Sequence, residues 1–358
     1  MCWDENQSIN SIISLWKRLM KFDILTQFNA LTEQEWNLLL TQSAVNAPFL
    51  QYGYQHTWWQ HQGGGEWQQA ELRIITARED KQLFGIAPLF IGERNGKKEI
   101  HFIGSIEISD YLDFIVQPRK SKEFITGIFN LIKEEKARFP GKICLFNIPD
   151  NSPSVEIIKE IGENKDWSIE IEPAYHTPTI TLSEDWDTYL AGINKKQRHE
   201  IRRKLRRASA SEDTVSWHIA TDKSMLNQDI ADFFQLMESD DEKKRFLTED
   251  MRKQINAIIQ WAFNAGILQL SFLTINDEKA AGYLCFDYGN IIWVYNSGFR
   301  PDFQYYSPGW ILLSYLIQHA INTGKTLFDF MRGDEAYKYR FGAADSFVMK
   351  VCAELSGD

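Results

Sequence analysis

The chain has 358 residues, more than one average domain, and its apolar content of 44% predicts a sizeable core rather than a disordered chain. The formal net charge of −10 argues against nucleic-acid binding as the default class. No window approaches the roughly 20 apolar residues of a membrane span, and the N-terminal apolar run is too short and too interrupted for a signal peptide.

The four cysteines lie far apart, and their spacing indicates neither zinc nor a redox pair. Cys144 and Cys285 stand in apolar runs and are interpreted as buried small hydrophobic residues. His56 and His61 have no evident third metal ligand. We therefore expect a reduced, cytoplasmic protein without a metal.

The first half of the chain alternates helical and strand patterns. A helical pattern over residues 33–43 precedes an aromatic segment that a glycine triplet ends at residue 65. After it we expect strands over 71–79, 83–94, 98–105 and 142–149, and helices over 121–139 and 154–167.

The second half begins near residue 176 with a strand over 176–182. Ser183 is a plausible N-cap for one long helix over 184–208. Beyond it we expect helices over 231–245, 249–266 and 308–324, and strands over 268–276, 279–289, 290–299, 326–331 and 347–351.

The two halves repeat one layout. Residues 72–91 and 270–289 each read as a strand, a charged turn and a second strand, with Gly85 and Gly282 near the start of the latter. A third strand, a helix and another strand follow in both halves. We predict an α+β protein built from one duplicated unit, with two unrelated α/β domains as the alternative. The expected boundaries are an N-terminal extension over 1–24, a first domain over 25–175 and a second over 176–358.

The helix expected at 308–324 begins after a strand with Ser307, Pro308 and Gly309. Serine is a good N-cap, and proline suits the first helical position. The unpaired amides at such a helix start favour an anion, so this turn could hold a phosphate or diphosphate. The alternative is an ordinary helix start without a ligand.

Residues 195–207 read KKQRHEIRRKLRR, a strongly basic helix in an acidic chain. Arg198, Arg202 and Arg206 form an i, i+4 row of like charges, which repel one another. That repulsion suggests a partner: either acidic side chains of this protein or an anionic ligand such as a phosphate. Arg198 and Arg202 are therefore candidate substrate-binding residues.

Two segments of the first half are also candidates for substrate binding. Asp110, Tyr111 and Asp113 stand in an otherwise apolar stretch, where a buried carboxylate could hold an amine or act as a base. An acidic turn between strands is the equal alternative. Trp58 and Trp59 are interpreted as core or as a surface that stacks on a sugar or acyl group.

The chain resembles the GNAT superfamily and, more narrowly, the CelD/BcsL-type acetyltransferases, which are related to the FemAB peptidyltransferases. The resemblance rests on TITLSEDWDTYLAGINKKQRHEIRRKLRRA, YNSGFRPDFQYYSPGWILLSYLIQHAI and FDFMRGDEAYKYRFGA, with GIAPLF and SDYLDFIV in the first half. It implies two GNAT-like domains in tandem, each with a central mixed sheet flanked by helices.

The resemblance also assigns roles. It implies that the strand carrying Tyr295, Asn296 and Ser297 offers backbone amides to the thioester of acetyl-CoA or another acyl-CoA. The turn of Tyr306, Ser307, Pro308 and Gly309 would then hold the diphosphate. This turn has one glycine where GNAT enzymes usually have two, which leaves aminoacyl-tRNA, the donor of FemAB relatives, open as an alternative.

Residues after the strand at 326–331 would line the transfer site in a GNAT-like sheet. Asp334 or Glu335 could accept the proton of the attacking amine. Tyr337 could protonate the leaving thiolate, and Lys338 could stabilise an oxyanion or a phosphate. The alternative is that Arg332–Asp334 and Glu335–Lys338 are ion pairs that fix a loop.

Three hypotheses follow for the function. The first is an acyl-CoA-dependent acyltransferase that acts on an amine or a saccharide, as in the biosynthesis of polysaccharide or the cell envelope. The second is a FemAB-like transferase that uses aminoacyl-tRNA, the one case in which a nucleic acid would be a partner. The third is a non-catalytic GNAT pair that binds a glycan or a protein.

Overall fold

The computed structural model describes residues 20–94 and 96–356. The described chain forms two compact units. The first contains residues up to Gln62, Glu66–Ala174 and the C-terminal segment from Met349, and the second contains Gly63–Gly65 and Tyr175–Val348. Most of the N-terminal extension expected over 1–24 lies outside the described residues, and its last residues belong to a strand, Met20–Leu25.

The first unit contains one mixed sheet. In spatial order its strands are β1 (Met20–Leu25), β2 (Ala70–Glu79), β3 (Gln82–Arg94), β4 (Lys97–Phe102), β6 (Lys142–Pro149), β14 (Phe347–Leu355) and β7 (Trp167–His176), and the short β5 (Ile115–Val116) pairs with β3. Its helices are α2 (Glu33–Leu40), α3 (Tyr52–Gly65), α4 (Ser121–Glu134) and α5 (Pro153–Gly162). β14 was expected in the second domain, but it lies between β6 and β7 of this sheet.

The second unit contains the other sheet. Its strands in spatial order are β8 (Thr179–Thr181), β13 (Leu327–Asp329), β12 (Ile291–Phe299), β11 (Glu278–Tyr288), β10 (Leu268–Ile275) and β9 (Val215–Ile219). Its helices are α6 (Trp186–Gly192), α7 (Lys195–Ser209), α8 (Leu226–Met237), α9 (Asp241–Phe246), α10 (Glu249–Asn264), α11 (Pro308–Asn322) and α12 (Ala336–Arg340).

Both sheets have the same central topology. In the first unit β2, β3 and β4 form an antiparallel meander, and β6 pairs parallel to β4. In the second, β10, β11 and β12 form the meander, and β13 pairs parallel to β12. A helix, α4 or α11, connects the parallel strands in each case, and this agrees with the predicted duplication.

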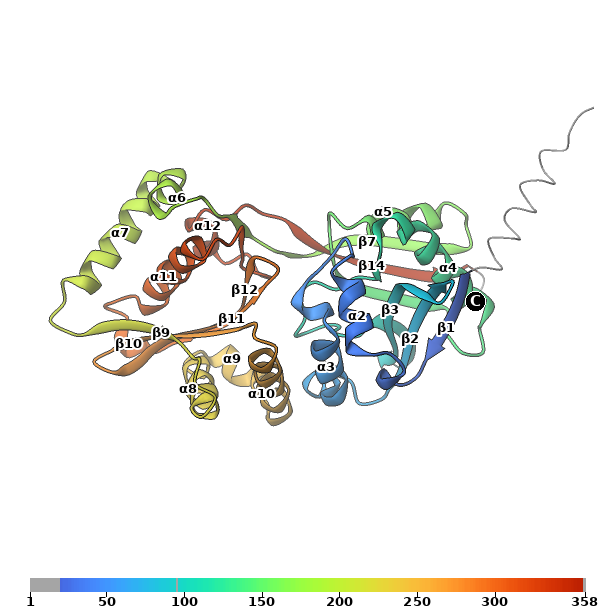
Figure 1. Ribbon diagram of the computed structural model, residues 1–358, viewed down its shortest axis with the longest axis horizontal. Helices are drawn as coiled ribbons and strands as arrows, with labels where there is room; N and C mark the ends of the chain where they lie inside the picture. The colour runs from blue at the N-terminus through green and yellow to red at the C-terminus, as the bar shows by residue number, and fades with distance from the viewer. Residues whose placement is uncertain (1–19, 95, 357–358) are drawn as a thin grey trace, which may run out of the picture. The chain divides into compact units, whose positions relative to one another are not determined.

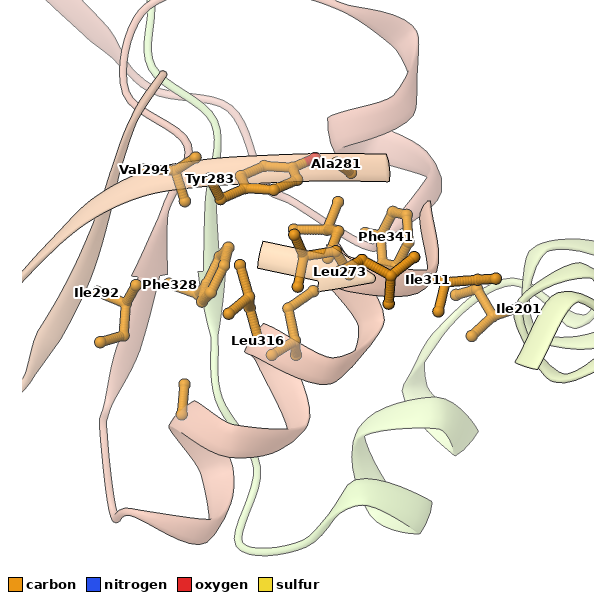
Figure 2. Packing of buried hydrophobic residues seen from close by; sticks show 14 of the residues in the cluster. Ile201, Leu273, Ala281, Tyr283, Ile292, Val294, Ile311, Leu316, Phe328 and Phe341 are labelled. Carbon is orange, nitrogen blue, oxygen red and sulfur yellow. The ribbon is translucent and has the colours of Figure 1, made fainter. Parts of the chain in front are cut away.

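Helices cover both faces of the second sheet (Figure 1). α7 and α11 pack on one face, where alternate strand residues point into a hydrophobic core. Figure 2 shows Ile201 of α7, Ile311 of α11 and Phe341 together in this core. α8 approaches the other face so closely that a Cβ at Gly298 of β12 would collide with the backbone of Leu236 and Met237.

Some elements differ from the sequence predictions. The single helix expected over 184–208 is two helices, because Asn194 leaves the helical conformation and its side chain caps α7 by accepting from the Lys196 amide. Asp185, not Ser183, caps α6. β1, β7 and β9 were not predicted, since short or alternating edge strands carry a weak apolar signal.

One cysteine prediction is wrong. Cys144 of β6 and Cys352 of β14 form a disulfide across a sequence separation of 208 residues. The disulfide can form because β14 lies next to β6 in the sheet. The local sequence around either cysteine does not indicate that these two strands are adjacent. Cys285 is a free, buried thiol, as predicted.

Candidate functional site

The parallel strands of the second sheet separate after three residue pairs. β13 pairs with β12 from Ile291–Leu327 to Trp293–Asp329, and β12 then continues to Phe299. The chain after β13 turns toward β8, because the Phe330 amide donates to the Pro178 carbonyl and the Gly333 amide to the His176 carbonyl. The strands therefore diverge at the level of residues 294–299.

The predicted thioester-binding residues lie on the diverging part of β12. The pairing register with β11 shifts so that Leu284 faces Asn296 while Cys285 faces Val294, which leaves Tyr295 as an extra residue. Such a bulge bends the strand and redirects its side chains. The Tyr295 ring packs near Phe286, and the side-chain oxygen of Asn296 accepts from the Ser297 amide at 2.8 Å.

Two predicted catalytic residues form an ion pair in the loop after β13. Lys338 is buried, and its ammonium donates to the carbonyls of Arg332 at 2.7 Å and Gly333 at 3.0 Å. It also lies 2.9 Å from the Glu335 carboxylate, which is 57% exposed. A Cβ at Gly333, whose φ is +112°, would collide with this carboxylate. The Glu335–Lys338 pair, the structural alternative considered above, is present, and its acid remains accessible to solvent.

Tyr337 lies on the inner side of α12, while Asp334 is exposed. The Tyr337 ring meets Phe330 edge to face. Burial, with the nearby Glu335 carboxylate as a second cause, raises the pKa of Tyr337 above its usual range. Its hydroxyl is thus protonated at neutral pH, as a proton donor requires.

Two residues at this place were missed by the sequence analysis. Tyr283 of β11 faces Ser297 across the sheet, and its hydroxyl lies 3.5 Å from the Gly309 carbonyl. Burial, with Tyr337 as a further cause, raises the pKa of Tyr283 well above its usual range. Lys243 of α9 donates to the Ser297 carbonyl, and burial lowers its pKa. Tyr283 lies in the apolar strand β11 and Lys243 in the charged helix α9. Neither sequence pattern indicates a binding site.

The start of α11 differs in detail from the predicted cap. Ser307 has a left-handed conformation (φ 57°), and its hydroxyl does not cap the helix. That hydroxyl accepts instead from the Lys204 ammonium at 2.6 Å. Within the described residues no partner is bonded to the Gly309 amide, and a Cβ at Gly309 would touch only Phe299, at 3.7 Å. The Gly309 amide at the helix start is thus an available hydrogen-bond donor close to the Lys204 ammonium.

Tyr306 holds the turn before α11 in place. It is buried, and its hydroxyl donates to Asp213 and lies 2.6 Å from the Ser211 hydroxyl. Asn276 also donates to Asp213, at 2.8 Å. The side chain of Tyr306 is therefore engaged by Asp213 and Ser211, and these contacts fix the turn.

The basic helix α7 lies beside the start of α11. Lys204 contacts Ser307 as described, and its ammonium lies 5.1 Å from the centre of the Trp310 ring. Arg207 donates to the Tyr305 carbonyl at 2.6 Å and stacks over the Tyr305 ring. The two features that the sequence analysis marked as candidate anion-binding sites, the basic helix and the start of α11, thus lie side by side.

The two arginines chosen from the sequence lie on another side of α7. Arg198 donates to the Leu190 and Ala191 carbonyls at the end of α6, at 3.4 and 3.0 Å. Arg202 forms an exposed ion pair with Asp187 of α6. Lys204 and Arg207 face the start of α11 instead. The rotation of α7 about its axis decides which side chains face α11, and the charge pattern does not reveal this rotation.

The predicted tryptophans belong to the first unit. Trp58 is fully buried, and its ring packs against Phe90 of β3. Trp59 is half-buried, with its ring centre 6.1 Å from that of Phe90. Their contacts place them in and beside the core of this unit.

The acidic segment of the first unit is buried. Asp110 and Tyr111 are each 7% exposed. Asp113 accepts hydrogen bonds from the hydroxyls of Ser152 and Ser154 at the start of α5. Burial raises the pKa of Asp113 from 3.8 to about 6. These contacts make Asp113 a link between the segment and α5.

The strand divergence of the first unit is filled by the chain itself. β4 and β6 pair at Ile100 and Ile143, and farther along β6 the Leu112 amide donates to the Asn147 carbonyl at 2.9 Å. The Asn147 side chain donates to the Ser109 carbonyl at 2.6 Å. Residues 103–114 thus lie beyond the paired part of β4 and β6, at the place that corresponds to residues 294–299 of β12.

Among the described residues no group of three histidine, cysteine or acidic side chains is arranged to hold a metal ion. No helix in the described part of the chain is both long and apolar enough to cross a bilayer.

Comparison with known proteins agrees with this geometry. Residues 195–339 match the family model of the acetyltransferase (GNAT) domain. The structure is similar to that of FemX, with a TM-score of 0.65 at 13% identity over 90% of this chain and 96% of that one.

Two further solved structures are similar. A conserved protein of unknown function from Bacteroides thetaiotaomicron has a TM-score of 0.58 at 11% identity, with 94% and 100% of the two chains covered. L-PGS from Bacillus licheniformis has a TM-score of 0.53 at 11% identity, with 91% and 92% covered. No curated protein matches the sequence.

At such identities the likeness shows the fold, and the predicted α+β architecture of two tandem GNAT-like domains is confirmed. The part of the chain that carries β12, α11 and α12 matches a GNAT acetyltransferase domain, within a fold that is shared with FemX.

Proposed function

We propose that the second unit transfers an acyl group from acyl-CoA to an amine or sugar acceptor. The observation that carries the proposal is the start of α11, where the Gly309 amide and the Lys204 ammonium lie beside the diverging end of β12. A helix start with an adjacent cation suits a diphosphate. The thioester arm would run from there along residues 295–297 toward the Glu335–Lys338 pair.

The proposed chemistry is direct transfer. The acceptor nitrogen or oxygen forms a bond to the thioester carbonyl carbon, and the carbon–sulfur bond breaks. Glu335 takes the proton from the nucleophile, since its carboxylate is exposed but anchored by Lys338. Tyr337 supplies a proton to the leaving thiolate. Lys338 keeps the loop in shape, because its donors are engaged by carbonyls.

The acceptor class follows the narrower resemblance to CelD/BcsL-type enzymes. We propose an amino sugar or a related precursor of polysaccharide or the cell envelope. The filled divergence of the first unit supports a single donor site in the chain, in the second unit.

A charge reversal at Gly309 tests the donor site. Gly309→Glu introduces a carboxylate at a helix start, where it favours the fold but repels a diphosphate. Gly309→Gln is the neutral control of similar size. We expect calorimetry to show acetyl-CoA binding to the natural chain, a loss of at least tenfold in affinity for the Gln variant, and no binding to the Glu variant. Equal affinity in all three would refute the site.

The exposed cations of α7 favour one second candidate, aminoacyl-tRNA as the donor. Arg203 and Arg206 are on the solvent side of this helix. Binding of tRNA that weakens steeply with salt and is lost in Arg203→Glu/Arg206→Glu, together with no affinity for acetyl-CoA, would favour this donor. Binding of neither donor would leave the non-catalytic hypothesis.

A further inference from the structure

A hollow of about 360 Å³ opens beside the first turn of α11. Residues from α7, α11 and α12 line it: Lys196, Gln197, Glu200, Lys204, Trp310 and Arg340. Its volume is at the lower end of the range for small-molecule sites. Of its lining residues, the donor site proposed above uses only Lys204.

The hollow carries positive charge that the protein neutralises only in part, since Lys204 has an acidic partner and Lys196 and Arg340 have none among the described residues. Glu200 is its one acidic residue, and that carboxylate is bound by the Arg203 guanidinium at 2.8 and 2.7 Å and lies 3.5 Å from the Lys204 ammonium. Within residues 20–94 and 96–356, the side chains of Lys196 and Arg340 have no ion-pair or hydrogen-bond partner. In a chain of net charge −10, two unpaired cations beside a third in one hollow favour an anionic ligand.

Lys204 connects this hollow to the start of α11. Its ammonium binds the Ser307 hydroxyl at 2.6 Å while its side chain lines the hollow. A ligand with two anionic groups can therefore place one at the Gly309 amide and the other in the hollow. Trp310 adds a half-buried aromatic wall against which a ring can pack.

We propose that this hollow binds the 3′-phosphate of the ribose of acyl-CoA, with Lys196 and Arg340 as its ligands. The inference rests on the proposed acyl-CoA donor and names how that donor is recognised. Coenzyme A carries a diphosphate and a 3′-phosphomonoester on the same ribose, which matches two adjacent anion sites. The terminal ribose of aminoacyl-tRNA carries an acyl ester at this position and no 3′-phosphomonoester.

The test compares coenzyme A with 3′-dephospho-coenzyme A by calorimetry on the full chain. We expect the natural protein to bind coenzyme A about tenfold or more tightly than the dephospho form, since phosphate contacts to two cations are lost. Lys196→Ala/Arg340→Ala should remove this preference and leave the affinity for the dephospho form unchanged. Lys195→Ala/Arg206→Ala makes the same charge change outside the hollow and should keep the preference.

Other outcomes are distinct. Equal binding of both ligands by the natural protein overturns the 3′-phosphate site but leaves the acyl-CoA donor intact. If the control variant Lys195→Ala/Arg206→Ala also loses the preference for coenzyme A, the preference comes from the overall positive charge of α7. That result also overturns the proposed 3′-phosphate site. Absence of binding by either ligand removes the proposed donor and this inference with it.

Discussion

Lys338 shows how much of a residue's role depends on burial, which the sequence does not display. The sequence predicted that Glu335 and Lys338 would lie in one loop after a buried strand, and they do. It did not predict that Lys338 is 2% exposed and bound to backbone carbonyls. A lysine in a run of charged residues usually lies on the surface, so its surroundings could come only from the structure.

The two carboxylates of this loop can be separated by substitution. We expect Glu335→Gln to lower kcat by about 10²-fold or more, because a positioned general base contributes on that order. Affinity for acyl-CoA should be unchanged, since the proposed donor site lies at α11. Asp334→Asn, the adjacent exposed acid, should retain most of the activity. Steady-state kinetics with an amine acceptor decides between them, and a larger loss for Asp334→Asn would reverse the assignment.

At the scale of elements, α7 was recognised from its sequence, but its orientation was not. The charge pattern marked Arg198 and Arg202, whereas Lys204 and Arg207 contact the start of α11. Both pairs flank the apolar positions that include Ile201, so the helical period alone cannot distinguish them. The break at Asn194 was missed for a similar reason, because cap residues also occur inside long polar helices.

This difference between the two sides of α7 is open to measurement. Lys204→Met should weaken acyl-CoA binding about tenfold, because it removes a charge beside the proposed diphosphate site. Arg198→Met makes the same charge change and should leave the affinity unaltered. It should lower the free energy of unfolding by about 1 kcal/mol, since two carbonyls of α6 lose their donor. Calorimetry and urea denaturation test both variants, and similar effects on binding would contradict the orientation argument.

At the scale of the whole molecule, the duplicated layout was predictable and its details were not. The order of strands, turn and helix recurs in both units, but Gly85 and Gly282 are not equivalent. A Cβ at Gly85 would meet Phe124 of α4, whereas one at Gly282 would meet Phe233 and Leu236 of α8. α4 corresponds to α11, not to α8, so the glycines serve opposite faces. The return of β14 to the first sheet likewise depends on contacts between distant residues.

The first unit should show two opposing effects of pH on stability. Burial raises the pKa of Asp113 from 3.8 to about 6, so the folded state binds more protons than the unfolded state between these values. Stability from this group therefore falls as pH rises through that range. Burial lowers the pKa of His101 from 6.5 to about 4, so the unfolded state binds more protons between those values, and stability rises with pH.

Single variants should expose these opposing slopes. Asp113→Asn should make the free energy of unfolding rise more steeply between about pH 4 and 6, by on the order of 2–3 kcal/mol across the range. His101→Gln should make the slope over the same range less positive than in the natural chain, because the contribution that rises with pH is removed. Urea denaturation at several pH values measures both slopes, and unchanged slopes would show that the two groups titrate alike in the folded and unfolded states.

The central claim is that acyl-CoA binds at the start of α11 and along the diverging part of β12. Hydrogen–deuterium exchange of the full chain, with and without acetyl-CoA, tests it directly. We predict slower exchange over residues 294–299 and 305–311, with residues 103–114 of the first unit unchanged. Slower exchange in residues 103–114 alone, or no change in either unit at saturating acetyl-CoA, would contradict the account.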